Sequence, residues 1–182
     1  MPTIPTMPAG VTGTRFDLQP MQAGMGQAVR FSNVQQMDSH YHNEQHGAVF
    51  GTSVKYLNAE ERKAYQVTIQ NGLLIDAKGQ PVDTRNASTA FANNKGRAIF
   101  VMDPQGNIYL SNEQTRGKFH HSSFMAGGIV ATAGDIRVEN GKIIAISRKS
   151  GHYRPTEAQI TQFADHIYHQ GAHGFYIDPD IS

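Results

Sequence analysis

The sequences KFHHSSFMAGG at residues 118–128 and SGHYRP at residues 150–155 bracket the part of the chain that decides the fold. A Gly/Ala-rich segment and a hairpin pattern lie between them. Adjacent His and Ser side chains between two aromatic residues need hydrogen-bond partners when they are buried. The pair Gly127 and Gly128 lets backbone amides approach a ligand closely. We therefore predict that the two sequences converge on one site.

Length and composition favour a single domain that spans no membrane. The chain has 182 residues, of which 38% are hydrophobic. It has no apolar run of the roughly 20 residues that cross a bilayer. The net charge of +1 lacks the basic excess that nucleic-acid binding needs, so we expect no nucleic-acid partner. The absence of Cys excludes disulfides, thiolate nucleophiles and Cys-ligated zinc.

The domain organisation follows from a change in composition near residue 36. Residues 1–36 are rich in Pro, Gly, Met and Gln and have no sustained period, which predicts a flexible N-terminal arm. They also lack the pattern of a secretory signal peptide. Residues 37–182 are predicted to form one catalytic-type α+β domain, and we expect a monomer.

The sequence SHYHNEQHG at residues 39–47 places three imidazoles and a carboxylate within seven residues. His40 and His42 would share a face of a strand, whereas His42 and His46 would share a face of a helix. Either spacing could hold zinc or nickel. The His-Glu-x-x-His pattern is missing, so we favour a polar loop or partner surface and predict no metal.

The remaining patterns predict a mostly antiparallel sheet with helices at both ends. Asn58 and Glu61 form a capping box for a short N-terminal helix, and Thr156 and Gln159 form another for a C-terminal amphipathic helix. Asn-Gly pairs predict two hairpins. The predicted strands are 65–69, 73–76, 97–102, 108–110, 135–139 and 142–147. The fold class is therefore α+β, with a mostly antiparallel β-sheet core.

The two bracketing sequences are also the basis of a family resemblance. Together with Lys55-Tyr56-Leu57 and Val82-Asp83-Thr84, they resemble the motif series in the central domain of plant IQ-motif calmodulin-binding proteins. The resemblance covers about residues 55–163. The same His-Ser-Ser-Phe and Ser-Gly-His-Tyr signatures are similar to CteC-type effectors, which ADP-ribosylate a threonine of ubiquitin. We find no IQ-type basic helix, so calmodulin binding does not carry over.

The effector resemblance implies an NAD-dependent mono-ADP-ribosyltransferase, that is, a bacterial toxin or virulence effector. Its fold would be ADP-ribosyltransferase-like, NAD would be its substrate, and a host protein hydroxyl, such as a threonine of ubiquitin, would be the acceptor. Such a protein would be secreted into a host cell or remain cytoplasmic. The alternative is a non-enzymatic protein-interaction module like the plant central domain.

ADP-ribose transfer passes through an oxocarbenium-like state and needs a carboxylate or a dipole beside the ribose. We predict that the catalytic residues are His121, Ser122, His152 and Glu157. His121 or His152 would move a proton or hold ribose hydroxyls, and Glu157 would act on the developing cation. Glu157 could instead only cap its helix.

A second set of residues is predicted to hold the cofactor. Backbone amides of the Gly pair would contact NAD, an aromatic ring would stack on nicotinamide, and an Arg at a helix start would favour the pyrophosphate. The predicted cofactor-binding residues are His120, Ser123, Phe124, Gly127, Gly128, Tyr153 and Arg154.

The chain departs from the transferase pattern at several positions. It has no Glu-x-Glu sequence, and Arg30 and His46 compete for the early basic role. Glu139 and Glu44 are the next candidates for the catalytic acid. A hydrolase built on Ser122 is the least favoured reading, because no Gly-x-Ser-x-Gly sequence is present.

Overall fold

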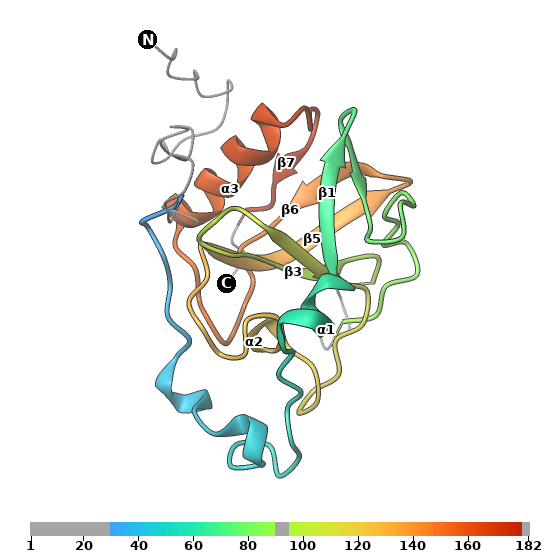
Figure 1. The fold of residues 1–182 in the computed structure, drawn as a ribbon. Coiled ribbons are helices and arrows are strands. Elements are labelled where there is room, and N and C mark those ends of the chain that lie inside the picture. Colours follow the sequence, from blue (N-terminus) through green and yellow to red (C-terminus); the bar gives the residue numbers. More distant parts are fainter. Residues whose placement is uncertain (1–29, 90–94, 180–182) are drawn as a thin grey trace.

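The computed structural model describes residues 30–89 and 95–179. Within these residues the core is a seven-stranded sheet in the order β2-β1-β4-β3-β5-β6-β7 (Figure 1). Neighbouring strands pair antiparallel, except β6 and β7, which are parallel. The strands are β1 (Gln66–Gln70), β2 (Leu73–Ile75), β3 (Ala98–Met102), β4 (Ile108–Ser111), β5 (Thr132–Glu139), β6 (Lys142–Ile146) and β7 (Tyr176–Ile177).

The helices of the described residues are short, apart from one near the C-terminal end. They are α1 (Ala59–Lys63), α2 (His121–Phe124), α3 (Glu157–His169) and the 3-10 helices η1 (Ser39–Tyr41) and η2 (Glu44–His46). Both predicted capping boxes are present, with Asn58 accepting from the Glu61 amide and Thr156 accepting from the Gln159 amide. The prediction of a mixed fold with a C-terminal helix and an antiparallel-rich sheet is therefore confirmed.

Both predicted hairpins are also confirmed. Asn71 and Gly72 join β1 to β2, and Asn140 and Gly141 join β5 to β6. All four residues have positive φ, between 47° and 84°. Two-residue turns of this kind match the right-handed twist of the strands that they connect, which explains why Asn-Gly is so reliable a signal.

The sheet curls because the segment after β2 reaches across to its other half. The Leu74 amide donates to the Gly141 carbonyl (2.7 Å), and the Thr84 amide donates to the Val138 carbonyl (2.8 Å). The Thr84 hydroxyl also accepts from the Val138 amide. Residues 81–84 therefore close the space between β2 and the β5–β6 hairpin.

Strand β3 divides the core into two hydrophobic clusters. Phe100 belongs to one cluster and stacks on Phe163 of α3, with ring centroids 4.5 Å apart. Its neighbours Ile99 and Val101 belong to the other cluster, together with Phe124 of α2. Because successive side chains of a strand point to opposite faces, the two clusters lie on opposite sides of the sheet.

Several features differ from the sequence-based prediction. Strand β5 begins at Thr132, three residues before the predicted start, and α2 forms where only a loop was expected. Residues 1–29 of the predicted arm lie outside the described residues. In the remaining part, residues 30–36, Phe31 is buried and packs edge-on against His166 of α3. Among the described residues, no helix is long and apolar enough to cross a membrane.

Candidate functional site

Residues 37–57, which we call the strap, cross both bracketing sequences. The Asp38 amide donates to the His152 carbonyl (2.8 Å). The Lys55 amide donates to the Lys118 carbonyl (2.7 Å), and the Leu57 amide donates to the Ser123 carbonyl (3.0 Å). In Figure 1 the strap is the blue-to-cyan segment that descends to the same end of the molecule as α2. It thus links two parts of the chain that lie about thirty residues apart.

Glu44 of the strap is the centre of the site. Its side chain is fully buried, because η2 lies between two left-handed residues, Asn43 and Gly47, and turns inward. Its Oε2 accepts a hydrogen bond from His152 Nε2 (2.7 Å). Its Oε1 accepts one from the Tyr56 hydroxyl (2.9 Å). Two donors from different segments therefore share one buried carboxylate.

The environment of Glu44 favours its ionised form. Burial by itself raises the pKa of this carboxyl. The donors His152 and Tyr56, together with the Ser122 hydroxyl beside it, outweigh burial, so the pKa lies below its ordinary value. Among the described residues, the buried Ser122 Oγ has no hydrogen-bond partner of regular geometry.

His120 and His121 are neutral donors and acceptors in the same region. His120 Nε2 accepts from the Gly117 amide (2.8 Å), so its proton is on Nδ1. His121 Nε2 donates to the Gly134 carbonyl in β5 (2.8 Å). Burial lowers the pKa of each ring to about 4. Both imidazoles are therefore uncharged at neutral pH, which suits hydrogen bonding to backbone groups.

Aromatic rings of the strap cover the imidazoles. Tyr41 stacks on His152 with centroids 3.8 Å apart, and Phe50 stacks on His120 at 5.1 Å. The two imidazoles are themselves 4.7 Å apart. We call Glu44, His120, His121, Ser122 and His152 the buried polar cluster. Its members are at most 5% exposed, so little of their surface is open to solvent.

Several of the predicted cofactor-binding residues make contacts within the protein. Tyr153 is buried and donates through its hydroxyl to the Gly128 carbonyl (2.7 Å), and its pKa is raised by burial. Phe124 is fully buried in a hydrophobic cluster. The Ser123 hydroxyl accepts from the His120 amide (2.9 Å). A Cβ at Gly127 would lie 2.9 Å from the Tyr56 hydroxyl, so close packing explains this glycine.

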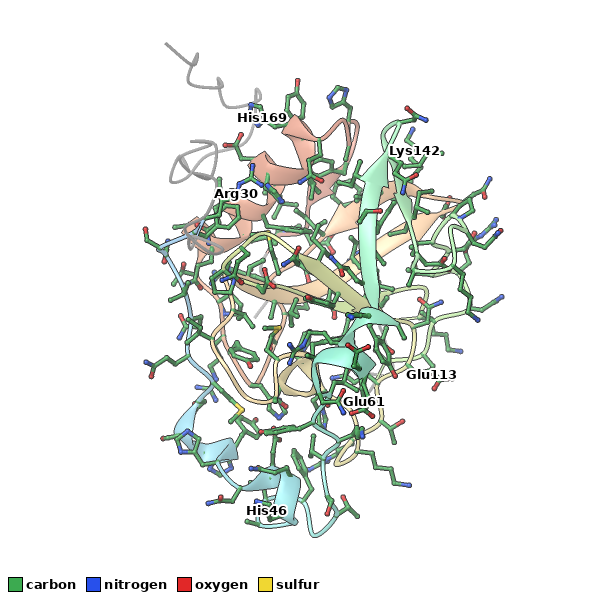
Figure 2. All side chains as sticks on the ribbon, in the orientation of Figure 1. Arg30, His46, Glu61, Glu113, Lys142 and His169 are labelled. Carbon is green, nitrogen blue, oxygen red and sulfur yellow. The ribbon has the colours of Figure 1, made fainter. Side chains whose placement is uncertain are left out.

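The other charged candidates lie away from the cluster. Glu157 is exposed in the first turn of α3, and Arg154 is exposed with a left-handed φ of 46°. Glu139 pairs with Arg137 on the surface. Arg30 and His46 are also exposed, and Figure 2 places them far apart. The structure therefore brings His120, His121, Ser122 and His152 together but leaves out Glu157 and Arg154.

The imidazole-rich sequence splits between the surface and the interior. His40, His42 and His46 are all exposed, whereas Glu44 between them is buried. In the described ranges no group of three or more His, Cys, Asp or Glu side chains could hold a metal ion. The absence of a metal stays a prediction, and Glu44 is the member of this segment that enters the interior.

Sequence reasoning underrated Glu44 and missed Tyr56, which donates to it, and Tyr41 and Phe50, which stack on the imidazoles. Glu44 and His152 are 108 residues apart, and no local period relates them. One local signal was available. Asn43 and Gly47 both tolerate left-handed backbone. Two such residues on either side of a three-residue segment are typical of a tight turn that changes the direction of the chain.

Comparisons with known proteins identify relatives of the central part of the chain. The family model described as "IQ motif-containing protein middle domain" matches residues 61–160, more than half of the chain. The IQ domain-containing proteins IQM2 and IQM3 of Arabidopsis thaliana are 36% and 35% identical over 111 residues. These alignments cover 60% of this chain but only 18% and 23% of the relatives. No solved structure matches.

These matches correct the main functional prediction. The relatives are IQ domain-containing proteins, so the prediction of an ADP-ribosyltransferase enzyme is wrong. The same finding contradicts the toxin and virulence-effector interpretation, and secretion into a host cell loses its basis. The CteC-type resemblance, the transferase-like fold and the ubiquitin acceptor gain no support. The resemblance to the plant central domain is confirmed.

Proposed function

This chain belongs to the family of the IQ motif-containing protein middle domain, and from that premise we propose that it is a non-enzymatic protein-interaction module. The chain spans about a fifth of the length of the relatives that it matches. The partners of the full-length relatives need not bind this chain, so its partner is proposed here from its own structure. We assign the interaction to the surface of the folded domain.

The burial of the polar cluster carries this proposal. A catalytic acid or base must come within hydrogen-bond reach of a substrate. Here the Glu44 carboxylate already accepts from His152 and Tyr56, and both rings at His120 and His121 are engaged by backbone groups. These contacts join the strap and α2 to the sheet, and they leave the exposed surface available to a partner.

The matched region also favours the folded domain over a separate recognition helix. The family description concerns a middle domain, and the match spans α1 through the first residues of α3. The names of the relatives refer to an IQ domain, yet the sequence contains no IQ-type basic helix. We therefore expect the partner to contact exposed strands and loops of this domain.

The test combines partner capture with an activity measurement on the full chain. Immobilised protein is incubated with cell extract, captured proteins are identified, and each is purified and titrated by calorimetry. We expect at least one saturable partner with micromolar or tighter affinity, and no nicotinamide release from labelled NAD above a protein-free blank. NAD binding itself stays a prediction, and the same calorimeter measures it.

A matched control separates specific capture from non-specific binding. Gly134→Val would place a Cβ 1.7 Å from the Ser147 carbonyl oxygen, so this variant should lose the fold and the partner together. Steady nicotinamide release by the wild type, or equal capture by both proteins, would contradict the proposal.

A further inference from the structure

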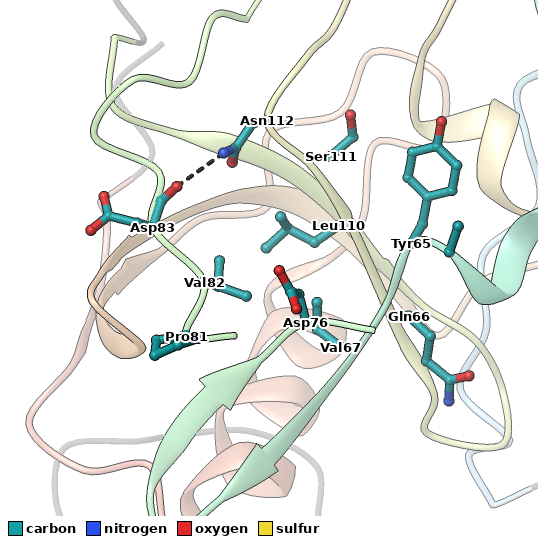
Figure 3. A pocket seen from close by; sticks show the side chains of 11 residues that line it. Tyr65, Gln66, Val67, Asp76, Pro81, Val82, Asp83, Leu110, Ser111 and Asn112 are labelled. Carbon is teal, nitrogen blue, oxygen red and sulfur yellow. Dashed lines mark hydrogen bonds between the residues drawn. The ribbon is translucent and has the colours of Figure 1, made fainter. Parts of the chain in front are cut away.

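A groove of about 400 Å³ opens between β1, β4 and the segment after β2 (Figure 3). It is lined by Tyr65, which precedes β1, by Val67 of β1, by Val82 opposite, and by Leu110 and Ser111 of β4. None of its lining residues belongs to the buried polar cluster. The volume lies within the range of roughly 300–1,000 Å³ that is typical of ligand pockets. This is a second feature of the molecule, and it faces solvent.

The groove is built by the curl of the sheet. Strand β1 pairs with β4 only at Gln66–Val67, and Tyr65 adds one further bond through its carbonyl to the Leu110 amide (3.0 Å). The opposite wall is fixed by the Val82 carbonyl, which accepts from the Gly141 amide (2.7 Å). The Asn112 amide group bridges the two walls by donating to the Asp83 carbonyl (2.9 Å). Both walls are therefore held in place before any ligand arrives.

The groove combines an apolar floor with a fixed negative charge. Val67, Val82 and Leu110 are at most 9% exposed and form the floor. Asp76 lies among them in Figure 3. Its Oδ1 accepts from the amides of Lys78 and Gln80 (2.9 Å each), which hold the carboxylate in place. No described donor reaches Oδ2, so this oxygen can accept another bond.

The charge around the groove is unbalanced. Asp76 and Asp83 line it, whereas no described Lys, Arg or His side chain does. Asp83 is already paired with Arg85 (2.7 Å). Asp76 is thus the carboxylate that a ligand would meet. An aliphatic stem that ends in a cation matches this apolar floor and this charge.

We propose that this groove binds a basic segment of the protein partner, which inserts one Lys or Arg side chain toward Asp76. This inference rests on the proposed function and names the chemistry of the partner. The stem of the inserted side chain would cover Val82 and Leu110, and its cation would pair with Asp76 Oδ2. An acidic partner would meet like charge here, so the groove also selects against acidic surfaces.

The test uses a blocked Leu-Arg-Leu peptide as the probe and amide shifts of the isotope-labelled full chain as the readout. We expect millimolar binding, with the largest shifts at Val82, Leu110 and Ser111. A Leu-Glu-Leu peptide should not shift these amides. Asp76→Asn keeps the acceptor for the loop amides but removes the charge, so it should weaken binding about fivefold. Glu60→Gln, an exposed carboxylate outside the groove, should leave binding unchanged.

The outcomes separate this inference from the proposed function. Equal affinity of Asp76→Asn and wild type, shifts elsewhere on the surface, or no binding up to 10 mM peptide, roughly the weakest measurable affinity, would overturn the groove assignment. So would shifts caused by the acidic peptide. None of these results bears on partner capture by the full chain. An unchanged amide spectrum of Asp76→Asn confirms that its fold is intact.

Discussion

The two faces of the sheet are covered by different kinds of packing. On one face, α3 packs an apolar stripe against the strands, and Phe163 stacks on Phe100. On the other face, the strap and α2 meet over hydrogen-bonded imidazoles and Glu44. The first face is stabilised by apolar area removed from water, and such packing tolerates exchange of one apolar side chain for another of similar volume. The second depends on matched donors and acceptors, so a single lost partner leaves a buried polar group unpaired.

The contrast also bears on the two bracketing sequences, whose imidazoles lie on the polar face. A helix stripe such as that of α3 can be built from many apolar residues. The contacts of His121 with the Gly134 carbonyl and of His152 with Glu44 need particular side chains at particular positions. These contacts give His121 and His152, which resembled catalytic residues, a packing role of this demanding kind.

The largest effect is expected on the apolar face. Phe163→Ala removes a fully buried ring from the contact between α3 and β3, and should lower the free energy of unfolding by about 3–5 kcal/mol. Urea denaturation measures this loss. Phe175→Ala, which changes a partly exposed ring of the same cluster, should cost less than half as much. Equal losses would show that the stripe of α3 does not dominate this face.

A smaller but more localised effect is expected on the polar face. Glu44→Gln offers one acceptor oxygen to two donors, the buried His152 and the half-buried Tyr56, and directs an amide N–H₂ at the other. We expect a loss of about 2 kcal/mol. Hydrogen exchange should accelerate at Asp38 and Leu57 of the strap but not within α3.

The matched control for this variant is Glu60→Gln, which alters an exposed pair with Lys63. It should change stability by less than about 0.5 kcal/mol. If Glu44→Gln were equally harmless, the buried carboxylate would not hold the strap, and the interpretation of the polar face would fail.

The smallest effect tests the two adjacent serines of α2. Both are fully buried, but Ser123 accepts from the His120 amide, whereas Ser122 Oγ lacks a partner of regular geometry among the described residues. Ser123→Ala should therefore cost about 1–2 kcal/mol, and Ser122→Ala less than about 1 kcal/mol. Thermal unfolding of both variants decides the order. The reverse order would indicate that the contact of Ser122 with Glu44 is the stronger one.

The sequence by itself determined the local elements of this protein. The Asn-Gly turns, both capping boxes and the stripe of α3 depend on residues at most four positions apart, so their physics is visible in a short window. The convergence of His120–Ser123 with His152 could be anticipated from their shared chemistry. Their chemical role could not, because buried and exposed imidazoles have the same sequence letters.

Only the tertiary structure decided which carboxylate joins them. Glu157 adjoins the second bracketing sequence but lies exposed on α3, whereas Glu44 reaches His152 across 108 residues. That contact exists because the strap folds back over the sheet and η2 turns the carboxylate inward. Burial and long-range pairing are properties of the assembled chain, and they placed Glu44 rather than Glu157 beside His152.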